Sequence, residues 1–484
     1  NAFGGFDANF KLPPTVNLGF AHLELRAEGA PSEFEGRKHS HRFQIQEFRR
    51  PEYEVKASAS AGPHFVGGHA DLTATANYYA GGPLPNAEVE WLVSSFPTNY
   101  TPPNRDDFTF GRWLPWWYYE DENPDSPGET FRGLTDAAGV HRLRIDFDSV
   151  NPPRTRLIAT DVNITDVNRQ FISANLRFLV HPAELYVGLR SPRVFAQQGE
   201  PLLVEAIVTD LDGKAVANRE IKMRAVRLNW VFEKGEWRER ESDPQQCAIR
   251  SAADPATCRF ETREGGRYRV VASITDDRER RNETELTLWV AGGKRPSERN
   301  LTQEKIELIP DRKEYKAGDT AEILIQAPFA PAEGVVTLRR SGLLSHERFT
   351  INSNSHTLRI PIKNEYAPNI HVQVDLVGAA WRTDEEGHQQ QQLPKRPAFA
   401  SAELKLSIPP LRRKLAVTVT PRNKTLEPGG ETTADIVVRD AAGKPVRGGE
   451  VALMVVDEAV LALTKYELAD PLKSFYTSRE AEVR

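Results

Sequence analysis

The two cysteines are the residues whose spacing most directly suggests chemistry. Cys247 and Cys258 are the only cysteines in the 484 residues, and Asp254-Pro255, a turn-favouring pair, lies between them. Two short extended arms around that turn would let the thiols face each other across a hairpin, so we predict a disulfide. The alternative is two unpaired buried thiols in a reducing compartment. Metal binding fits less well, because the pair lacks the close C-x-x-C spacing and a companion histidine cluster.

Other polar groups suggest turns and exposed strands more than catalysis. His39 and His41 lie on one side of an extended segment and could bind a metal, but without a third ligand an exposed strand is the more ordinary interpretation. Asp210 and Asp212 depart from the calcium-loop spacing and indicate a turn. The sequence has no Gly-rich phosphate loop ending in Gly-Lys-Ser/Thr, no H-E-x-x-H and no G-x-S-x-G. We therefore expect no enzyme, no catalytic residue, no metal site and no cofactor.

A tryptophan-rich stretch, FTFGRWLPWWYYEDENPDSPG at residues 108–128, is the remaining candidate binding element. Its aromatic side chains could form a platform for a carbohydrate or a peptide; glycan affinity would then be lost on replacing Trp116 or Trp117. The more ordinary interpretation is a long insertion whose aromatic rings seal the edge of their own domain or the contact with the next one.

A repeated nonapeptide indicates the elements that must position these residues. GGPLPNAEV begins at Gly81, GKAVANREI at Gly213 and GKPVRGGEV at Gly443, and each copy follows an alternating segment typical of a strand. Glycine suits such a turn because it adopts positive φ without a Cβ clash. A degenerate copy follows Gly318, where prolines replace the glycine turn. The repeated unit is strand, turn, strand.

Alternation of apolar and polar residues extends along most of the chain. We interpret four such segments as late strands of one repeated design: residues 18–27, 138–147, 265–274 and 368–377. The predicted fold is all-β, a series of tandem antiparallel β-sandwiches of the immunoglobulin or fibronectin type III kind. The predicted units are the C-terminal part of one domain at 1–44, complete domains at 45–183, 184–292 and 303–410, and the N-terminal part of another at 411–484.

Composition and charge narrow the classes of function. Hydrophobic residues make up 39% and charged residues 27% of the chain, and the net charge is −5, which favours a globular soluble protein without a nucleic-acid partner. The apolar stretches fall short of the roughly 20 residues of a membrane span, and the N-terminus has no export signal. Because the chain opens within a strand pattern and ends on the charged EAEVR, we expect it to be a fragment of a longer protein.

The repeated glycine turn and three further stretches together resemble bacterial α2-macroglobulins, a family of large thioester-type protease traps. The three stretches are FRRPEYEV at 48–55, GLTDAAG at 133–139 and, most specifically, VALMVVDEAVLALTKYELADPLKSFY at 451–476. The resemblance covers essentially the whole chain as a run of macroglobulin domains. It implies that the five units are the end of the second macroglobulin domain, the third, fourth and fifth domains, and the opening of the sixth.

The resemblance also implies a mechanism and partners. In this family an endopeptidase cuts a flexible bait segment in the sixth domain, the molecule rearranges, and a thioester elsewhere captures the protease. The implied bait region starts near Ser478, with Arg479 and Arg484 as candidate tryptic-type cleavage points. The implied partners are target proteases and the other domains of the parent chain. The family's thioester cysteine lies in C-x-E-Q, which neither cysteine of this chain matches.

The family resemblance implies a role in host defence and a periplasmic location, with membrane attachment only through an inner-membrane lipid anchor outside this segment. The oxidising compartment that a disulfide requires agrees with that location. The alternative function is a structural or adhesive array of immunoglobulin-like modules at the cell surface, which would bind partners through loops such as the tryptophan-rich one.

Overall fold

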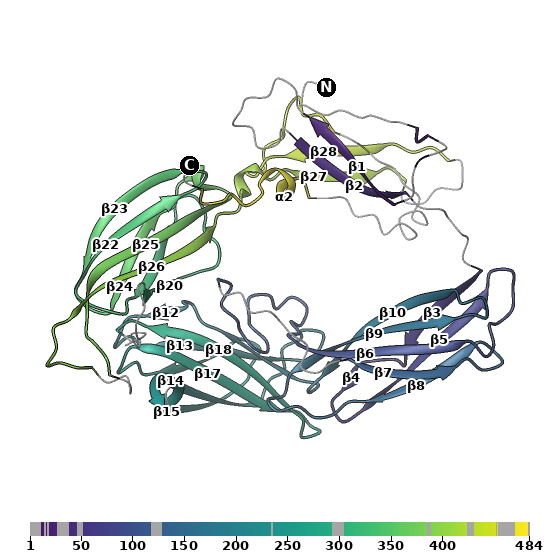
Figure 1. Cartoon of the computed structure of the whole chain (residues 1–484), viewed down its shortest axis with the longest axis horizontal. Helices are drawn as coiled ribbons and strands as arrows, with labels where there is room; N and C mark the ends of the chain where they lie inside the picture. Colours follow the sequence, from purple (N-terminus) through teal and green to yellow (C-terminus); the bar gives the residue numbers. More distant parts are fainter. Residues whose placement is uncertain are drawn as a thin grey trace.

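The computed structural model describes most of the chain, and strands dominate it (Figure 1). The described residues are 11–13, 16, 19–26, 38–45, 52–117, 128–233, 236–292, 304–384, 389–423, 430–451, 453 and 470–482. Figure 1 shows three β-sandwiches that follow one another along a curve. The prediction of tandem antiparallel β-sandwiches is confirmed.

The first sandwich packs a three-stranded sheet on a five-stranded one. The smaller sheet has the order β3 (Tyr53–Ala59), β5 (His69–Tyr78) and β8 (Val140–Asp146). The larger has the order β4 (His64–Phe65), β10 (Phe171–His181), β9 (Thr155–Thr165), β6 (Glu88–Thr98) and β7 (Glu129–Leu134).

The second sandwich repeats this arrangement. Its smaller sheet has the order β11 (Tyr186–Arg190), β13 (Leu202–Thr209) and β16 (Ala256–Phe260). Its larger sheet has the order β12 (Phe195–Ala196), β18 (Arg281–Val290), β17 (Gly266–Thr275), β14 (Glu220–Glu233) and β15 (Glu236–Arg250).

The third sandwich has the same two sheets. Its smaller sheet has the order β20 (Glu307–Pro310), β21 (Thr320–Gln326) and β24 (Ser355–Pro361). Its larger sheet has the order β19 (Glu304–Lys305), β26 (Arg396–Ser407), β25 (Asn369–Ala380), β22 (Ala332–Arg339) and β23 (Leu343–Ile351). Short 3-10 segments occur at Asn364–Tyr366 and Leu411–Arg413.

Smaller elements lie at either end of the chain. β1 (Gly19–Arg26) pairs with β2 (Lys38–Ile45), and β27 (Ala416–Pro421) pairs with β28 (Ala434–Arg439). The helix α2 (Pro471–Phe475) follows. The division of the chain at residues 44, 183, 292 and 410 stays a prediction.

Each sandwich has its own hydrophobic core. Along β5, for example, Ala70, Leu72, Ala74 and Ala76 are buried and alternate with more exposed residues. Such alternation places every second side chain between the sheets, where removal of apolar surface from water stabilises the pairing. The buried residues of the three sandwiches fall into separate clusters, around Trp91, around Tyr268 and around Ile323.

The repeated glycine turns have the backbone conformation expected of them. Gly81, Gly213 and Gly443 have φ of 100°, 83° and 79°, so the predicted need for positive φ is confirmed. In the last two turns an aspartate stands three residues before the glycine. Asp210 Oδ1 accepts hydrogen bonds from the backbone N–H groups two and four residues on, and Asp440 does the same. Asp210 is thus a turn residue, as expected.

One interpretation of the alternating segments was wrong. The strand at 138–147 is β8, which belongs to a three-stranded sheet, whereas the strands at 265–274 and 368–377 are β17 and β25, in the middle of five-stranded sheets. They are therefore not equivalent strands. Period-two alternation shows that one face of a strand is buried, and it does not show in which of two facing sheets the strand lies.

Candidate functional site

The described residues contain no cluster with the composition of a metal site. No group of three or more His, Cys, Asp and Glu side chains among them could hold an ion, and His39 and His41 are exposed on β2. Within the same residues, no helix is long and apolar enough to cross a membrane. The candidate functional features are instead the junctions between sandwiches and the segment after α2.

A segment after β6, residues 99–117, joins the first sandwich to the second, and we call it the strap. It runs antiparallel to β11, where the N–H of Thr109 donates to the carbonyl of Leu189 over 2.8 Å and the reverse bond spans 2.9 Å. It then runs parallel to β18, where the N–H of Trp113 donates to the carbonyl of Glu285 over 3.0 Å. Because β11 and β18 belong to different sheets, the strap closes one open side of the second sandwich.

Side chains of the strap anchor it to the second sandwich. Phe108 and Phe110 form a buried cluster with Tyr186 and Ile207. The Tyr100 hydroxyl donates to the carbonyl of Leu211 over 2.6 Å. The guanidinium of Arg105 donates to the carbonyl of Gly213 over 2.8 Å, so the strap contacts the repeated glycine turn directly.

The strap's tryptophans reach the third sandwich as well. Trp113 and Trp117 pack against Trp289 of β18, with ring centroids 6.1 Å and 5.6 Å away. The same cluster contains Ile309 and Leu324 of the third sandwich. The interpretation of this stretch as a contact with the next domain is confirmed, and the contact extends one domain further. Of the remaining aromatic residues, Tyr118 and Tyr119 lie outside the described residues.

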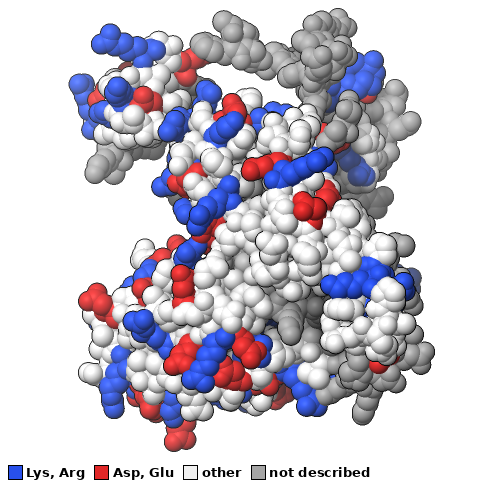
Figure 2. Space-filling model, turned by 90° about the vertical axis from the view of Figure 1, so that its left-hand side faces the viewer, with Lys and Arg blue, Asp and Glu red and all other residues white. Residues whose placement is uncertain are grey.

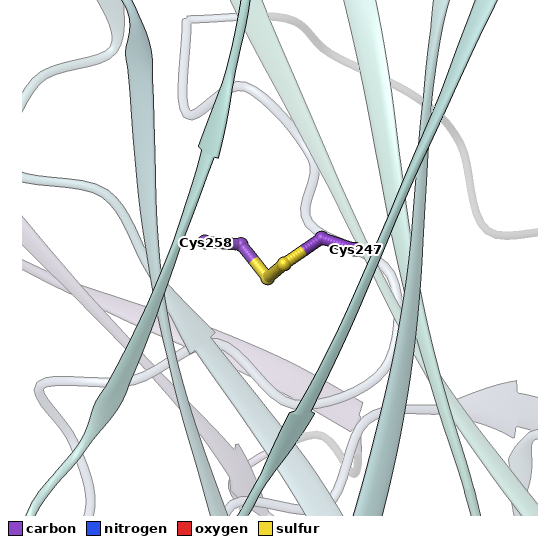
Figure 3. Close-up of a disulfide and its surroundings, with 2 residues drawn as sticks. All are labelled: Cys247 and Cys258. Atoms are coloured by element: carbon purple, nitrogen blue, oxygen red, sulfur yellow. A yellow bond between two sulfur atoms is a disulfide. The ribbon is translucent and has the colours of Figure 1, made fainter.

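The structure joins Cys247 and Cys258 in a disulfide (Figure 3). Cys247 lies on β15 and Cys258 on β16, with Cα atoms 6.2 Å apart. These strands belong to different sheets, so the expectation that the thiols face each other across a hairpin was wrong. The turn at Asp254 carries the chain from one sheet to the other, and the bond ties the two sheets together.

Removal of the disulfide is expected to destabilise the second sandwich by about 3 kcal/mol, the loop-closure value for a short loop. The test is chemical denaturation of the Cys247→Ala/Cys258→Ala variant. Reduction of the wild-type protein should reproduce the loss, and reduction of the variant should change nothing. A variant that unfolds at the wild-type denaturant concentration would contradict a stabilising bond.

The contact between the strap and the Gly213 turn gives a matched pair of glycine variants. A Cβ on Gly213 would lie 2.0 Å from the carbonyl oxygen of Pro103 in the strap, whereas a Cβ on Gly443 would meet nothing within 4 Å. The φ values of Gly213 and Gly443 are nearly equal. Gly443→Ala should therefore lower the free energy of unfolding by about 1 kcal/mol through backbone strain alone. Gly213→Ala should cost about 3 kcal/mol, because overpacking adds to the strain. Equal costs in denaturant unfolding would show that the strap does not press on this turn.

A buried histidine lies where the first two sandwiches meet. His181, at the end of β10, has Nδ1 2.8 Å from the Tyr186 hydroxyl, which lies 2.7 Å from the Thr155 hydroxyl. The ring of Tyr100 stands edge-on to it, with centroids 4.9 Å apart. Burial, with a smaller contribution from the nearby His64, lowers the pKa of His181 to about 4. The imidazole is therefore neutral at pH 7, and acid would charge this junction.

The segment after α2 is an exposed tail that is hydrogen-bonded to the third sandwich. Asp470 caps the helix by accepting a hydrogen bond from the Leu472 N–H over 2.9 Å. Ser478 and the side chain of Arg479 are exposed, while the backbone of Arg479 is hydrogen-bonded to Asn369 of the third sandwich. Arg484 lies outside the described residues, and the predicted start of a bait region here stays a prediction.

Charged side chains of both signs are interspersed on the face drawn in Figure 2. Among the described residues, charged side chains form cross-strand ion pairs, such as Arg224 with Glu241 at 2.6 Å and Arg339 with Glu403 at 2.5 Å. Exposed pairs of this kind contribute little stability, but they keep the surface near neutral.

Comparisons with known proteins give a consistent result. A family model described as the alpha-2-macroglobulin bait region domain matches residues 306–463. The alpha-2-macroglobulin homolog of Nostoc sp. is 24% identical over 498 residues, which cover 100% of this chain and 25% of that protein. The circularly permutated Ras protein 2 of Dictyostelium discoideum is 23% identical over 100% of this chain and 14% of its own length.

Solved structures give a similar set of neighbours. Salmonella alpha-2-macroglobulin reacted with methylamine is 16% identical, with a TM-score of 0.42 over 98% of this chain and 30% of that one. The chain spans a quarter or less of the length of the two curated relatives above.

The chain therefore combines tandem β-sandwiches with a match to the alpha-2-macroglobulin bait region domain. Along its whole length the chain is similar to an alpha-2-macroglobulin homolog, and its residues 306–463 match that family's bait region domain.

Proposed function

We propose that this chain is the scaffold part of a broad-range endopeptidase inhibitor, which traps a protease after the protease cuts a bait segment. The observation that carries the proposal is the match to the bait region domain, which spans the third sandwich and the β27–β28 pair and ends shortly before the exposed tail. The partners are target proteases and the other domains of the full-length protein.

Differences in local stability support this proposal. A protease needs an extended segment of backbone, so a closed sandwich is cut only when it opens locally. Each of the three sandwiches has its own core, and the second is closed by the strap on one side and tied across its sheets by the disulfide. The tail after α2 has few side chains to bury. Cleavage would therefore be directed beyond the sandwiches.

The same proposal includes the cellular location of the protein and the functions that other domains would supply. A disulfide fits the periplasm, and a lipid anchor elsewhere in the full-length protein would hold it at the inner membrane. Both cysteines are used in the disulfide, so a thioester, where the full-length protein has one, would come from another domain. The chain has no catalytic role in this account. The assignment of its units to the second through sixth macroglobulin domains belongs to the same proposal.

A protease inhibition assay on the full-length protein tests the proposal. Trypsin and elastase are incubated with it and then assayed on a large protein substrate and on a small peptide substrate. A trap should remove most activity toward the large substrate and leave most activity toward the small one, because only the large substrate is kept from the enclosed active site. Unchanged activity toward both would overturn the proposal and favour a structural or adhesive array.

A further inference from the structure

The third sandwich carries a small binding site for peptide backbone. Asn369 is the first residue of β25 and is 2% exposed. The N–H of Arg479 donates to its Oδ1 over 2.8 Å, and its Nδ2 donates to the carbonyl of Arg479 over 2.8 Å. An amide side chain that pairs with both backbone groups of one residue reproduces the pairing of a neighbouring strand, so it recognises extended backbone whatever the side chain.

Two further groups complete this site. His371, two residues along β25, has Nε2 2.9 Å from the Arg479 carbonyl, and its Nδ1 lies 2.6 Å from Glu403 of β26. The glutamate orients the ring toward the tail. The backbone N–H of Ser341, in the turn between β22 and β23, donates to the carbonyl of Glu480 over 2.8 Å. Ser341 has φ of 47°, an unusual value for serine that turns its N–H toward the tail.

We propose that Asn369, His371 and Ser341 form an anchor that holds the backbone of Arg479 and Glu480 and thereby fixes the N-terminal limit of the cleavable segment. Because a serine protease must bind the N–H and carbonyl of the residue it cuts after, the anchor competes for the groups that trypsin needs at Arg479. Arg479 is exposed, but its backbone N–H and carbonyl are hydrogen-bonded to Asn369. Cuts therefore fall beyond Glu480. After cleavage, the part of the tail that contains Arg479 and Glu480 stays bound to the third sandwich.

This inference rests on the proposed function only in treating the cut segment as a bait. The hydrogen bonds of the anchor do not depend on that function. Tryptic cleavage after Arg479 in the native full-length protein, followed by mass spectrometry, measures it directly. Asn369→Leu removes both side-chain hydrogen bonds and should raise the rate at Arg479 about 25-fold, since each bond contributes on the order of fivefold and cleavage follows the released population. Asn354→Leu is the matched control, because Asn354 holds the Ala327 carbonyl within the same sandwich and should leave the rate unchanged.

A second variant keeps the test valid if the strand substitution harms folding. Arg479→Pro changes only the exposed tail and removes the N–H that donates to Asn369. It should speed cleavage after Glu480 by a glutamate-specific protease about fivefold. Rapid tryptic cleavage after Arg479 in the wild type, or unchanged rates in both variants, would overturn the anchor. Either result leaves the inhibition assay free to succeed or fail independently.

Discussion

Trp289→Ala is expected to destabilise the junction of the second and third sandwiches by about 4 kcal/mol. Trp289 is 1% exposed and packs against Phe195 of its own sandwich, Ile309 and Leu324 of the next, and the strap. Its indole N–H also donates to Glu307 over 3.1 Å. Truncation of a buried tryptophan removes this apolar contact and leaves a cavity that rigid sheets cannot close.

The matched control is Trp230→Ala, because Trp230 lies on β14 of the same sandwich and is 43% exposed. It should cost less than about 1 kcal/mol. Thermal unfolding should show the transition of the second and third sandwiches lowered for Trp289→Ala only. Similar shifts for both variants would mean that the tryptophan cluster does not couple these domains.

The junction of the first and second sandwiches is expected to lose about 3 kcal/mol as the pH falls from about 6.5 to about 4, since one pKa unit corresponds to about 1.4 kcal/mol. The pKa of His181 is about 4 in the folded protein, below the 6.5 of an unperturbed histidine, so in this window the unfolded chain binds a proton that the folded chain does not. Stability therefore decreases as the pH decreases. His64, Tyr100 and Tyr186 face the imidazole, and they supply no negative charge at these pH values.

The pH dependence is measured as the change in melting temperature between pH 7.5 and pH 4.5. His181→Gln, which stays neutral, should be less stable at pH 7.5 but should lose much less on acidification. His69→Gln, at an exposed position of β5, should retain the full wild-type loss. An equally steep profile in His181→Gln would contradict the assignment. A further loss is expected below about pH 4: burial would raise the pKa of Asp276, but hydrogen bonds from the backbone and from Arg280 together lower it below its usual 3.8.

The architecture could be predicted from local sequence because it depends on local rules. Glycines such as Gly213 and Gly443 mark turns that need positive φ, and alternation such as that of β5 marks strands with one buried face. The order of strands within each sheet could not be read this way. The strand β8 alternates as clearly as β17, and only tertiary pairing decides which sheet takes each.

The functional contacts join residues that lie far apart in the chain, so the spacing of residues in the sequence could not predict them. The pairing of Thr109 with Leu189 joins two domains, and the bonds from Asn369 to Arg479 span 110 residues. Asn369 could not be distinguished in the sequence from any other strand asparagine. The tryptophans of the strap were visible as an unusual cluster, but their partner Trp289 lies in another domain and completes the cluster only in the folded chain.

We expect the closed sandwiches to direct proteolysis to one segment beyond them. Limited digestion of the full-length protein with trypsin, elastase and a glutamate-specific protease, with the first cuts mapped by mass spectrometry, tests it most directly. The earliest cuts of all three enzymes should cluster C-terminal to Glu480, while residues 52–292 and 304–408 stay intact. Early cuts scattered over the turns of the sandwiches, such as those at Gly213 and Ser341, would contradict it.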